Sequence, residues 1–213
     1  MSCNEKQVPS VVIKRLPRYY RYLGELLKSD IKRISSGALS EKMDVTASQI
    51  RQDFNYFGGF GQQGYGYNVE YLYNAIGEIM GVDKVNDTVI IGAGNLGKAL
   101  ANHNAFEKRG FRITALFDLN PDIVGTKVDG KPVLSMEELE NYIKNNNIGI
   151  AILTVPKGET QAIADKLTEY GVKGLLNFSY TELKADDSIT VENVHLSDSL
   201  MTLSYNIKER DMK

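Results

Sequence analysis

The chain has 213 residues, a net charge of −2 and a single cysteine, Cys3. This length suits one large domain or two modest ones, and one cysteine excludes an internal disulfide. No apolar run is as long as a membrane span or a signal-peptide core, so we expect a cytoplasmic protein without membrane contacts.

The periodicity of apolar residues predicts a first helix over 11–28, with Pro17 either kinking it or marking its start. The expected apolar stripe is Ile13, Leu16, Tyr20, Leu23 and Leu27. Basic residues exceed acidic ones over 14–33, which indicates an anionic partner or only a solvated helix face. The basic residues are Lys14, Arg15, Arg18, Arg21, Lys28, Lys32 and Arg33.

A short serine-capped helix is expected over 35–43, and a third helix follows at Thr46. Thr46 and Gln49 fit a capping box, in which Gln49 would reach back to the backbone of Thr46. Arginine can pair with guanine, and glutamine or asparagine with adenine, so a helix with such residues on its outer face suits a DNA major groove. The apolar face is Ile50, Phe54 and Phe57, and the opposite face is Ser48, Arg51, Gln52 and Asn55.

Glycines alternate loosely with aromatic residues over 57–67, which favours a short β-hairpin with Gln62, Gln63 and Gly64 at its tip. Three helices and a hairpin make a winged helix-turn-helix. The alternative is a small helical domain with a glycine-rich linker. A helix over 69–81 would end this first domain, and the second would begin near Val82.

The central motif is a β-branched run from Thr88 that ends in G-x-G-x-x-G and passes into a helix-favouring segment. The motif comprises Gly92, Ala93, Gly94, Asn95, Leu96 and Gly97. Its glycines would allow a tight turn, close approach of a pyrophosphate, and close packing of helix on strand. Asp118 ends the next expected strand, where a carboxylate binds adenine ribose hydroxyls and repels a 2′-phosphate, so NAD(H) is favoured over NADP(H). The alternative is a glycine turn in an unrelated α/β protein.

The remaining chain alternates helices and strands, as in a doubly wound parallel sheet. Strands are expected over 148–155 and 174–178, and helices over 135–146 and 158–170. The strand ends place Thr154, Val155, Pro156, Asn177 and Phe178 near the cofactor, or else as ordinary loop residues. An amphipathic helix over 196–208 would cover its own sheet or reach a second subunit; its stripe is Leu196, Leu200, Leu203 and Ile207. No Cys/His cluster has metal-ligand spacing, so no metal is expected.

The order of these parts resembles the bacterial Rex family of redox-sensing transcriptional repressors. The resemblance covers nearly the whole chain and is carried by Lys14 to Pro17, Thr46 to Gly58, Gly64 to Leu72, Gly92 to Gly97, Phe117-Asp118, Thr154 to Pro156, Leu176 to Phe178 and the closing helix. It implies a homodimer with a winged helix, a Rossmann domain that binds NADH or NAD⁺, and a C-terminal helix swapped onto the partner. Such a repressor occupies palindromic operator DNA when NADH is low and releases it when NADH binds.

The resemblance also suggests DNA contacts from Arg15, Thr46, Gln49 and Tyr56, and cofactor contacts from His103 and Leu196. His103 stands where the family commonly has a tyrosine near the nicotinamide. His195 stands where it commonly has an aspartate before the swapped helix. The wing tip, Gln62 and Gln63, is less basic than is common in the family, which implies a weaker hold on phosphates.

We therefore expect an α/β protein with a winged-helix domain over 1–81, a Rossmann domain over 82–194 and a swapped dimerisation helix over 195–213. Three functions compete: a redox-responsive repressor, an NAD-dependent oxidoreductase with an accessory domain, and a DNA-binding protein that uses nucleotide only structurally. No separate substrate domain is evident, and His103 and His195, which are possible acids or bases, lack an evident set of substrate-binding partners. The repressor is favoured, without catalytic residues.

Overall fold

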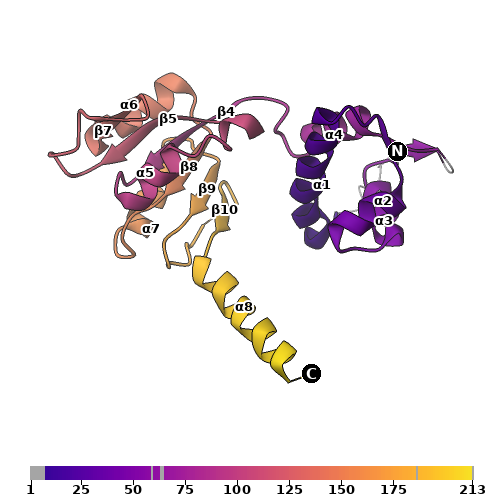
Figure 1. The fold of residues 1–213 in the computed structure, drawn as a ribbon. Helices are drawn as coiled ribbons and strands as arrows, with labels where there is room; N and C mark the ends of the chain where they lie inside the picture. Colours follow the sequence, from indigo (N-terminus) through magenta and orange to yellow (C-terminus); the bar gives the residue numbers. More distant parts are fainter. Residues whose placement is uncertain (1–7, 59, 63–64, 186, 213) are drawn as a thin grey trace. The chain divides into compact units, whose positions relative to one another are not determined.

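The computed structural model describes residues 8–58, 60–62, 65–185 and 187–212. The chain divides into two compact units between Lys84 and Val85, slightly beyond the boundary expected near Val82 (Figure 1). Each unit is described by itself.

The first unit has the elements of a winged helix. A hairpin of β2 and β3 confirms the predicted wing, and β1 pairs antiparallel with β3 on its other side. The strand β1 has two residues and was not predicted. The elements are α1 Ser10–Lys28, β1 Arg33–Ile34, α2 Ser36–Met43, α3 Ala47–Asn55, β2 Gly61–Gln62, β3 Gly66–Asn68 and α4 Val69–Ile79.

The helix α1 continues through Pro17, which neither begins nor ends it. Its buried stripe is Val12, Leu16, Tyr19, Leu23 and Leu26, so three of the five expected positions were off by one residue. Ile13 is exposed, and Tyr20 and Leu27 are only partly buried. Both stripes have helical spacing, and α1 turns Tyr19 inward because its hydroxyl donates to a buried acceptor on α3, Asp53.

Two tyrosines and two glycines join α1 to α4. The rings of Tyr20 and Tyr73 are stacked, with centroids 4.2 Å apart and planes 12° from parallel. A Cβ at Gly24 would lie 3.2 Å from the Tyr73 ring, and one at Gly77 would lie 3.2 Å from the Tyr20 ring. Each glycine therefore makes room for the tyrosine of the opposite helix, which lets the two helices approach closely.

The second unit is a seven-stranded sheet with strand order β10-β9-β8-β4-β5-β7-β6. All neighbours pair parallel except β6 and β7, which pair antiparallel. The elements are β4 Asn86–Ile91, α5 Asn95–Ala101, η1 Glu107–Arg109, β5 Phe111–Asp118, β6 Lys127–Val128, β7 Lys131–Ser135, η2 Met136–Glu138, α6 Leu139–Asn146, β8 Ile150–Leu153, α7 Thr160–Glu169, β9 Gly174–Asn177, β10 Thr190–Asn193 and α8 Leu196–Asp211.

Alternating residues of the central strands form two cores, one on each face of the sheet. Val89 and Ile91 pack with residues of α6 and α7, whereas Ile90 packs with Ala101 at the end of α5. The chain leaves β4 for β5 on one side and returns to β8 on the other, so β4 is the topological switch point. Ligands of such sheets bind at the carboxyl ends of the strands at this point.

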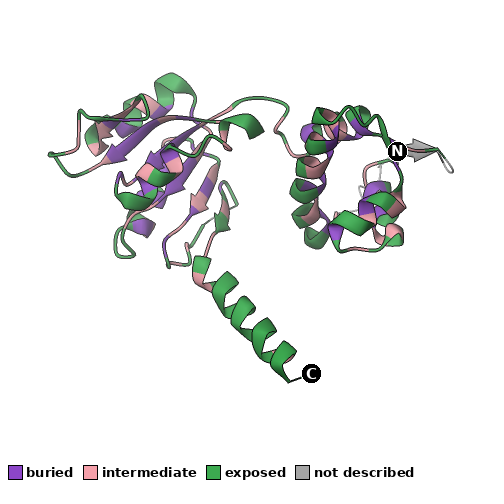
Figure 2. Ribbon diagram, in the orientation of Figure 1, coloured by how far each residue is buried: buried purple, intermediate pink, exposed green. Residues whose placement is uncertain are grey.

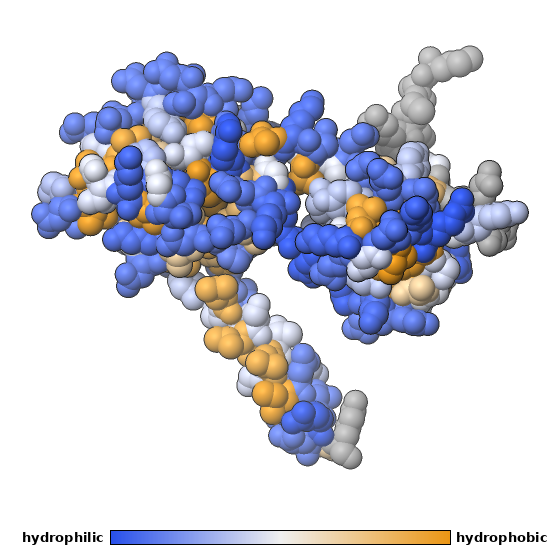
Figure 3. Space-filling view, turned by 45° about the horizontal axis from the view of Figure 1, so that its top comes forward, coloured by the Kyte–Doolittle hydropathy of each residue, from blue (hydrophilic) through white to orange (hydrophobic). Residues whose placement is uncertain are grey.

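The last helix, α8, has no buried residue in the described structure (Figure 2). Its apolar side chains lie exposed along its length, as the space-filling view shows (Figure 3). The large exposed ones are Leu196, Leu200, Met201, Leu203, Tyr205, Ile207 and Met212, just past its end. The predicted helix is confirmed, and α8 buries none of these side chains against its own sheet. Within the described chain, no helix has both the length and the apolar character needed to cross a bilayer.

Candidate nucleotide and nucleic-acid sites

The three glycines of the central motif have different surroundings. Gly92 has φ +96°, and a Cβ there would lie 2.7 Å from the carbonyl oxygen of Thr154. A Cβ at Gly97 would clash with the carbonyl oxygen of Gly92. A Cβ at Gly94 would meet nothing within 4 Å. The first and third glycines are therefore required by packing within the chain, whereas Gly94 borders open space that a ligand can use.

The carboxylate of Asp118 lies against the glycine turn. The backbone N–H of Ala93 donates to Asp118 Oδ2 at 2.6 Å, and the N–H of Asn120 donates to Oδ1 at 2.8 Å. Each carboxylate oxygen has a further lone pair, so Asp118 can still accept hydrogen bonds from ribose hydroxyls. The turn and the acid thus meet at the ends of β4 and β5, as the spacing predicted.

A cavity of about 560 Å³ opens beside this turn, within the size range of small-molecule sites. Its walls are largely apolar, and Asp118 and Glu159 supply its charges. The lining residues are Ile91, Gly92, Gly94, Phe117, Asp118, Leu119, Asn120, Met136, Thr154, Val155, Pro156, Glu159 and Ile163. The space at Gly94, the N-terminus of α5 and the Asp118 carboxylate fit the adenosine and pyrophosphate of a dinucleotide.

Several predicted cofactor residues line this cavity, namely Thr154, Val155 and Pro156. Thr154 also holds the turn, since its Oγ1 lies 2.8 Å from the carbonyl oxygen of Gly92. Asn95 and Leu96 begin α5 and are exposed, whereas Ala93 is buried and contributes its N–H to Asp118. Sequence reasoning missed Leu119, Met136, Glu159 and Ile163, which no short motif marks.

The remaining predicted cofactor residues lie outside the cavity. Asn177 is fully buried, and its amide bonds to Thr181 and Asn193 and accepts from the N–H of Ser179. Its side chain is therefore buried, and its NH2 group donates only to acceptors within the chain. Phe178 is half-buried against the core beside α5, and Leu196 is exposed on α8.

The two histidines have aromatic neighbours. His103 is exposed after α5 and meets the Phe106 ring edge to face, with centroids 5.3 Å apart. His195 caps α8 and stacks on Tyr180, with its Nδ1 3.6 Å from Asp198 Oδ2. His195 Nε2 is buried without a hydrogen-bond partner in the described part of the chain. Those residues also contain no cluster of three or more potential metal ligands.

The helix α3 presents the polar face that the sequence predicted. Ser48, Arg51, Gln52 and Asn55 are exposed, and the opposite side buries Ile50 and Phe54. Thr46 caps the helix by accepting from the N–H of Gln49 at 3.1 Å. Arg51 donates to Ser36 Oγ on α2 at 2.9 Å, which orients the guanidinium. Tyr56 follows α3 and is half-buried. The Gln62 side chain and Gln63 fall outside the described residues.

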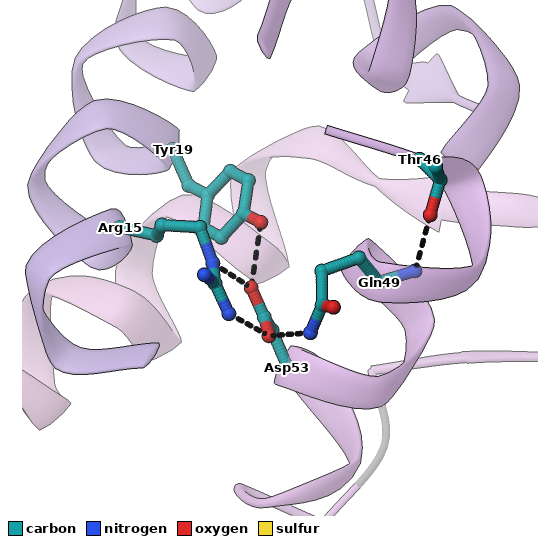
Figure 4. A network of polar contacts seen from close by, with 5 residues as sticks. All are labelled: Arg15, Tyr19, Thr46, Gln49 and Asp53. Atoms are coloured by element: carbon teal, nitrogen blue, oxygen red, sulfur yellow. Dashed lines mark hydrogen bonds and ion pairs between the residues drawn. The ribbon is translucent and has the colours of Figure 1, made fainter. Parts of the chain in front are cut away.

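A buried carboxylate, Asp53, joins α1 to α3 (Figure 4). Asp53 is 0% exposed and accepts from Arg15 Nε at 2.6 Å, Arg15 Nη2 at 2.7 Å, Tyr19 Oη at 2.7 Å and Gln49 Nε2 at 3.0 Å. Burial raises the pKa of Asp53, but the hydrogen bonds from Arg15, Gln49 and Tyr19 outweigh it and bring the pKa below its ordinary value. Burial, and then the bond to Asp53, raise the pKa of Tyr19 well above its ordinary value.

This network bears on two residues that were expected to contact DNA. Arg15 pairs its guanidinium bidentately with Asp53, and its DNA contact stays a prediction. The capping box predicted at Gln49 is wrong: its side-chain amide donates to the buried carboxylate of Asp53 and so is turned away from the N–H of Thr46. A DNA contact of Gln49 also stays a prediction. The missed signal was an acid at a position of α3 that helical spacing places beside Ile50 and Phe54.

Comparison with known proteins finds matches for both units of the chain. A family model described as "CoA binding domain" matches residues 83–181, and one described as "Putative DNA-binding protein N-terminus" matches residues 7–55. The redox-sensing transcriptional repressor Rex of Thermoanaerobacter pseudethanolicus is 56% identical over 206 residues, 97% of this chain and 92% of that protein.

Solved structures of a Rex-family repressor, RSP, have the same fold. RSP in complex with β-NAD⁺ and operator DNA superposes with a TM-score of 0.90 and 56% identity, covering 96% of this chain and 94% of that chain. RSP in complex with β-NADH gives a TM-score of 0.88 and 53% identity, covering 97% of each chain.

Proposed function

The chain belongs to the Rex family of redox-sensing transcriptional repressors, and we propose that it binds palindromic operator DNA when NADH is scarce and releases it when NADH binds. One observation carries this proposal: a single chain joins a helix face suited to reading DNA with a crevice suited to NADH or NAD⁺. The family consists of regulators and not of enzymes, which argues against the oxidoreductase.

The proposed cofactor site is supported by Gly94 and Asp118. Gly94 borders open space at the N-terminus of α5, where backbone N–H groups favour a pyrophosphate. Asp118 lies where it can accept hydrogen bonds from the ribose hydroxyls. A related repressor is in complex with β-NADH, and another structure of it holds β-NAD⁺ with operator DNA. We assign NADH and NAD⁺ as the ligands of this chain.

The proposed DNA-binding site is supported by the exposed row of polar residues on α3. Arg51 and Gln52 have the donors and acceptors that read guanine and adenine, while Ser48 and Asn55 flank them. Arg15 and Gln49 have a supporting role, because they hold Asp53 and fix α3 against α1. Tyr56 supports the DNA-binding face indirectly as well, because it is the C-cap residue of α3.

A palindromic operator requires a two-fold dimer, and α8 is the element best suited to form it. Its apolar side chains, among them Leu200, Leu203 and Ile207, lie exposed in the single chain. Exposed apolar surface of this extent indicates an interaction site. We propose that α8 packs on a second copy, with Leu196 of the partner subunit near the nicotinamide.

Discrimination between the cofactor states rests on charge. The oxidised nicotinamide carries a positive charge and the reduced one does not, so an apolar lining disfavours NAD⁺. Phe178 and the partner's Leu196 would supply that lining. A hundredfold loss of DNA affinity on reduction requires about 2.7 kcal/mol of coupling, which is ordinary for allostery.

The test is a fluorescence-anisotropy titration of palindromic DNA at constant ionic strength, with NAD⁺ and NADH added separately. We expect NADH to release the DNA at concentrations where NAD⁺ does not. Equal operator affinity without cofactor, with NAD⁺ and with NADH would instead favour a structural nucleotide. Steady NADH oxidation with a carbonyl compound would favour the oxidoreductase.

A further inference from the structure

The charged side chains that line the cavity beside the glycine turn are all negative. Its lining contains two carboxylates, Asp118 and Glu159, and none of the lysine, arginine or histidine residues that the structure describes. Backbone N–H groups at the glycine turn can then bind the pyrophosphate of a nucleotide. Two carboxylates in the lining disfavour any further negative charge on that nucleotide.

Glu159 differs from Asp118 in the hydrogen bonds that its side chain makes. Asp118 accepts hydrogen bonds from the N–H groups of Ala93 and Asn120. Among the described residues, Glu159 is hydrogen-bonded only through its backbone. Its N–H donates to the carbonyl oxygen of Pro156, and its carbonyl oxygen accepts from the N–H of Ile163. Its side chain is exposed and has no hydrogen-bond or ion-pair partner among the described residues. Its charge is therefore free to act on a ligand in the cavity.

Coenzymes that contain adenosine differ in whether its ribose carries a phosphate. NADPH carries a phosphate on the 2′-hydroxyl of the adenosine ribose, and coenzyme A carries one on the 3′-hydroxyl. One of the families that match this chain is described as a CoA-binding domain. A phosphate monoester adds about 1.5 to 2 negative charges at neutral pH, and carboxylates repel it.

We propose that Glu159 acts with Asp118 as a second selectivity determinant, so that the cavity takes adenine nucleotides with an unmodified ribose and rejects 2′- and 3′-phosphorylated adenosine, including coenzyme A. The inference rests on the proposed nucleotide site. It extends the role of Asp118, which alone would explain only the 2′-phosphate.

A competing explanation is that Glu159 merely stabilises α7, because a carboxylate next to a helix N-terminus is favourable. That role would change the melting temperature but not the relative affinities of ligands that differ by one phosphate. The ratio of affinities is therefore the decisive quantity, and it also cancels any general loss of binding.

The experiment is calorimetric titration of the full chain with ADP, 2′-phospho-ADP and 3′-phospho-ADP. We expect the wild type to prefer ADP over both phosphorylated forms. Glu159→Gln removes one charge, so each preference should fall by about threefold to tenfold, the size expected for charges interacting through solvent. Glu169→Gln makes the same change at the other end of α7, away from the cavity, and should leave both preferences as in the wild type.

Two results would overturn the inference. One is a wild type that binds 3′-phospho-ADP as tightly as ADP, and the other is an unchanged preference in Glu159→Gln. If that variant fails to fold, the wild type still decides, because a preference caused by charge must shrink between low and high salt. A preference independent of salt would contradict the proposal. Loss of the DNA response to NADH with these preferences intact would count only against the proposed function.

Discussion

Replacing Asp53 with asparagine should destabilise the first unit strongly. The substitution keeps the size of the side chain but removes the charge that Arg15 faces, and the arginine side chain is only 21% exposed. Removing one partner of a buried pair costs about 3–5 kcal/mol. Since Arg15 keeps some access to water, we expect the lower end, about 3 kcal/mol. For a unit of this size that corresponds to a fall in melting temperature of about 12–24 °C.

A second ion pair in the same chain provides a matched control. Arg112 and Asp87 have the same bidentate geometry, at 2.6 Å and 2.7 Å, but their side chains are 57% and 25% exposed. Asp87→Asn should therefore cost much less stability than Asp53→Asn, because exposed ion pairs contribute little. The assay is calorimetric unfolding with and without NADH, because a ligand raises the transition of the unit that binds it and so identifies it.

The effect of Asp53 should disappear in acid. Its pKa in the folded protein is lowered, so its stabilisation is complete above the pKa of the unfolded chain, about 3.9, and is lost as pH falls through the lower folded value. The wild type and Asp53→Asn should thus differ fully at neutral pH and converge below about pH 4. Equal melting of the two proteins at neutral pH would refute the reasoning, as would equal costs for Asp53→Asn and Asp87→Asn.

Two further predictions concern the proposed sites. Arg51→Ala should weaken operator binding by about 1–3 kcal/mol without changing NADH affinity, as measured by anisotropy and calorimetry; unchanged operator affinity would contradict a base contact. Truncation before Leu196 should give a monomer in sedimentation, because it removes the exposed apolar face of α8; a dimer that survives truncation would show that another surface carries it.

The parts that sequence alone predicted are those with local signals. The glycine motif, the cap at Thr46 and the spacing to Asp118 lie within short stretches, and each is present where expected. The capping box at Ser135 and Glu138 is present as well, although it opens a short 3-10 turn before α6. Such features depend on a few neighbouring residues and hardly on the rest of the fold.

Most of what the sequence did not predict depends on contacts between distant residues. Arg15 pairs with a residue 38 positions away, and a basic run gives no sign of which of its members will be used internally. Strands as short as β1 and β6 carry no detectable alternation, since they depend on the neighbour with which they pair. Glu159 enters the cavity only because β8 and α7 meet the glycine turn there. Side-chain periodicity cannot supply this information.

Adjacent residues of α1 face different neighbours, which bears on how such a protein diverges. Tyr19 holds α3 through Asp53, and Tyr20 stacks on Tyr73 of α4, the helix that leads to the second unit. The residues that fix α3 are thus buried and separate from the exposed row that faces outward. Substitutions in that row, such as Gln52 or Asn55, can accumulate without disturbing the internal joints. In the DNA-reading role proposed for this row, such substitutions would give descendants of one ancestor new operator sequences while the response to NADH is inherited unchanged.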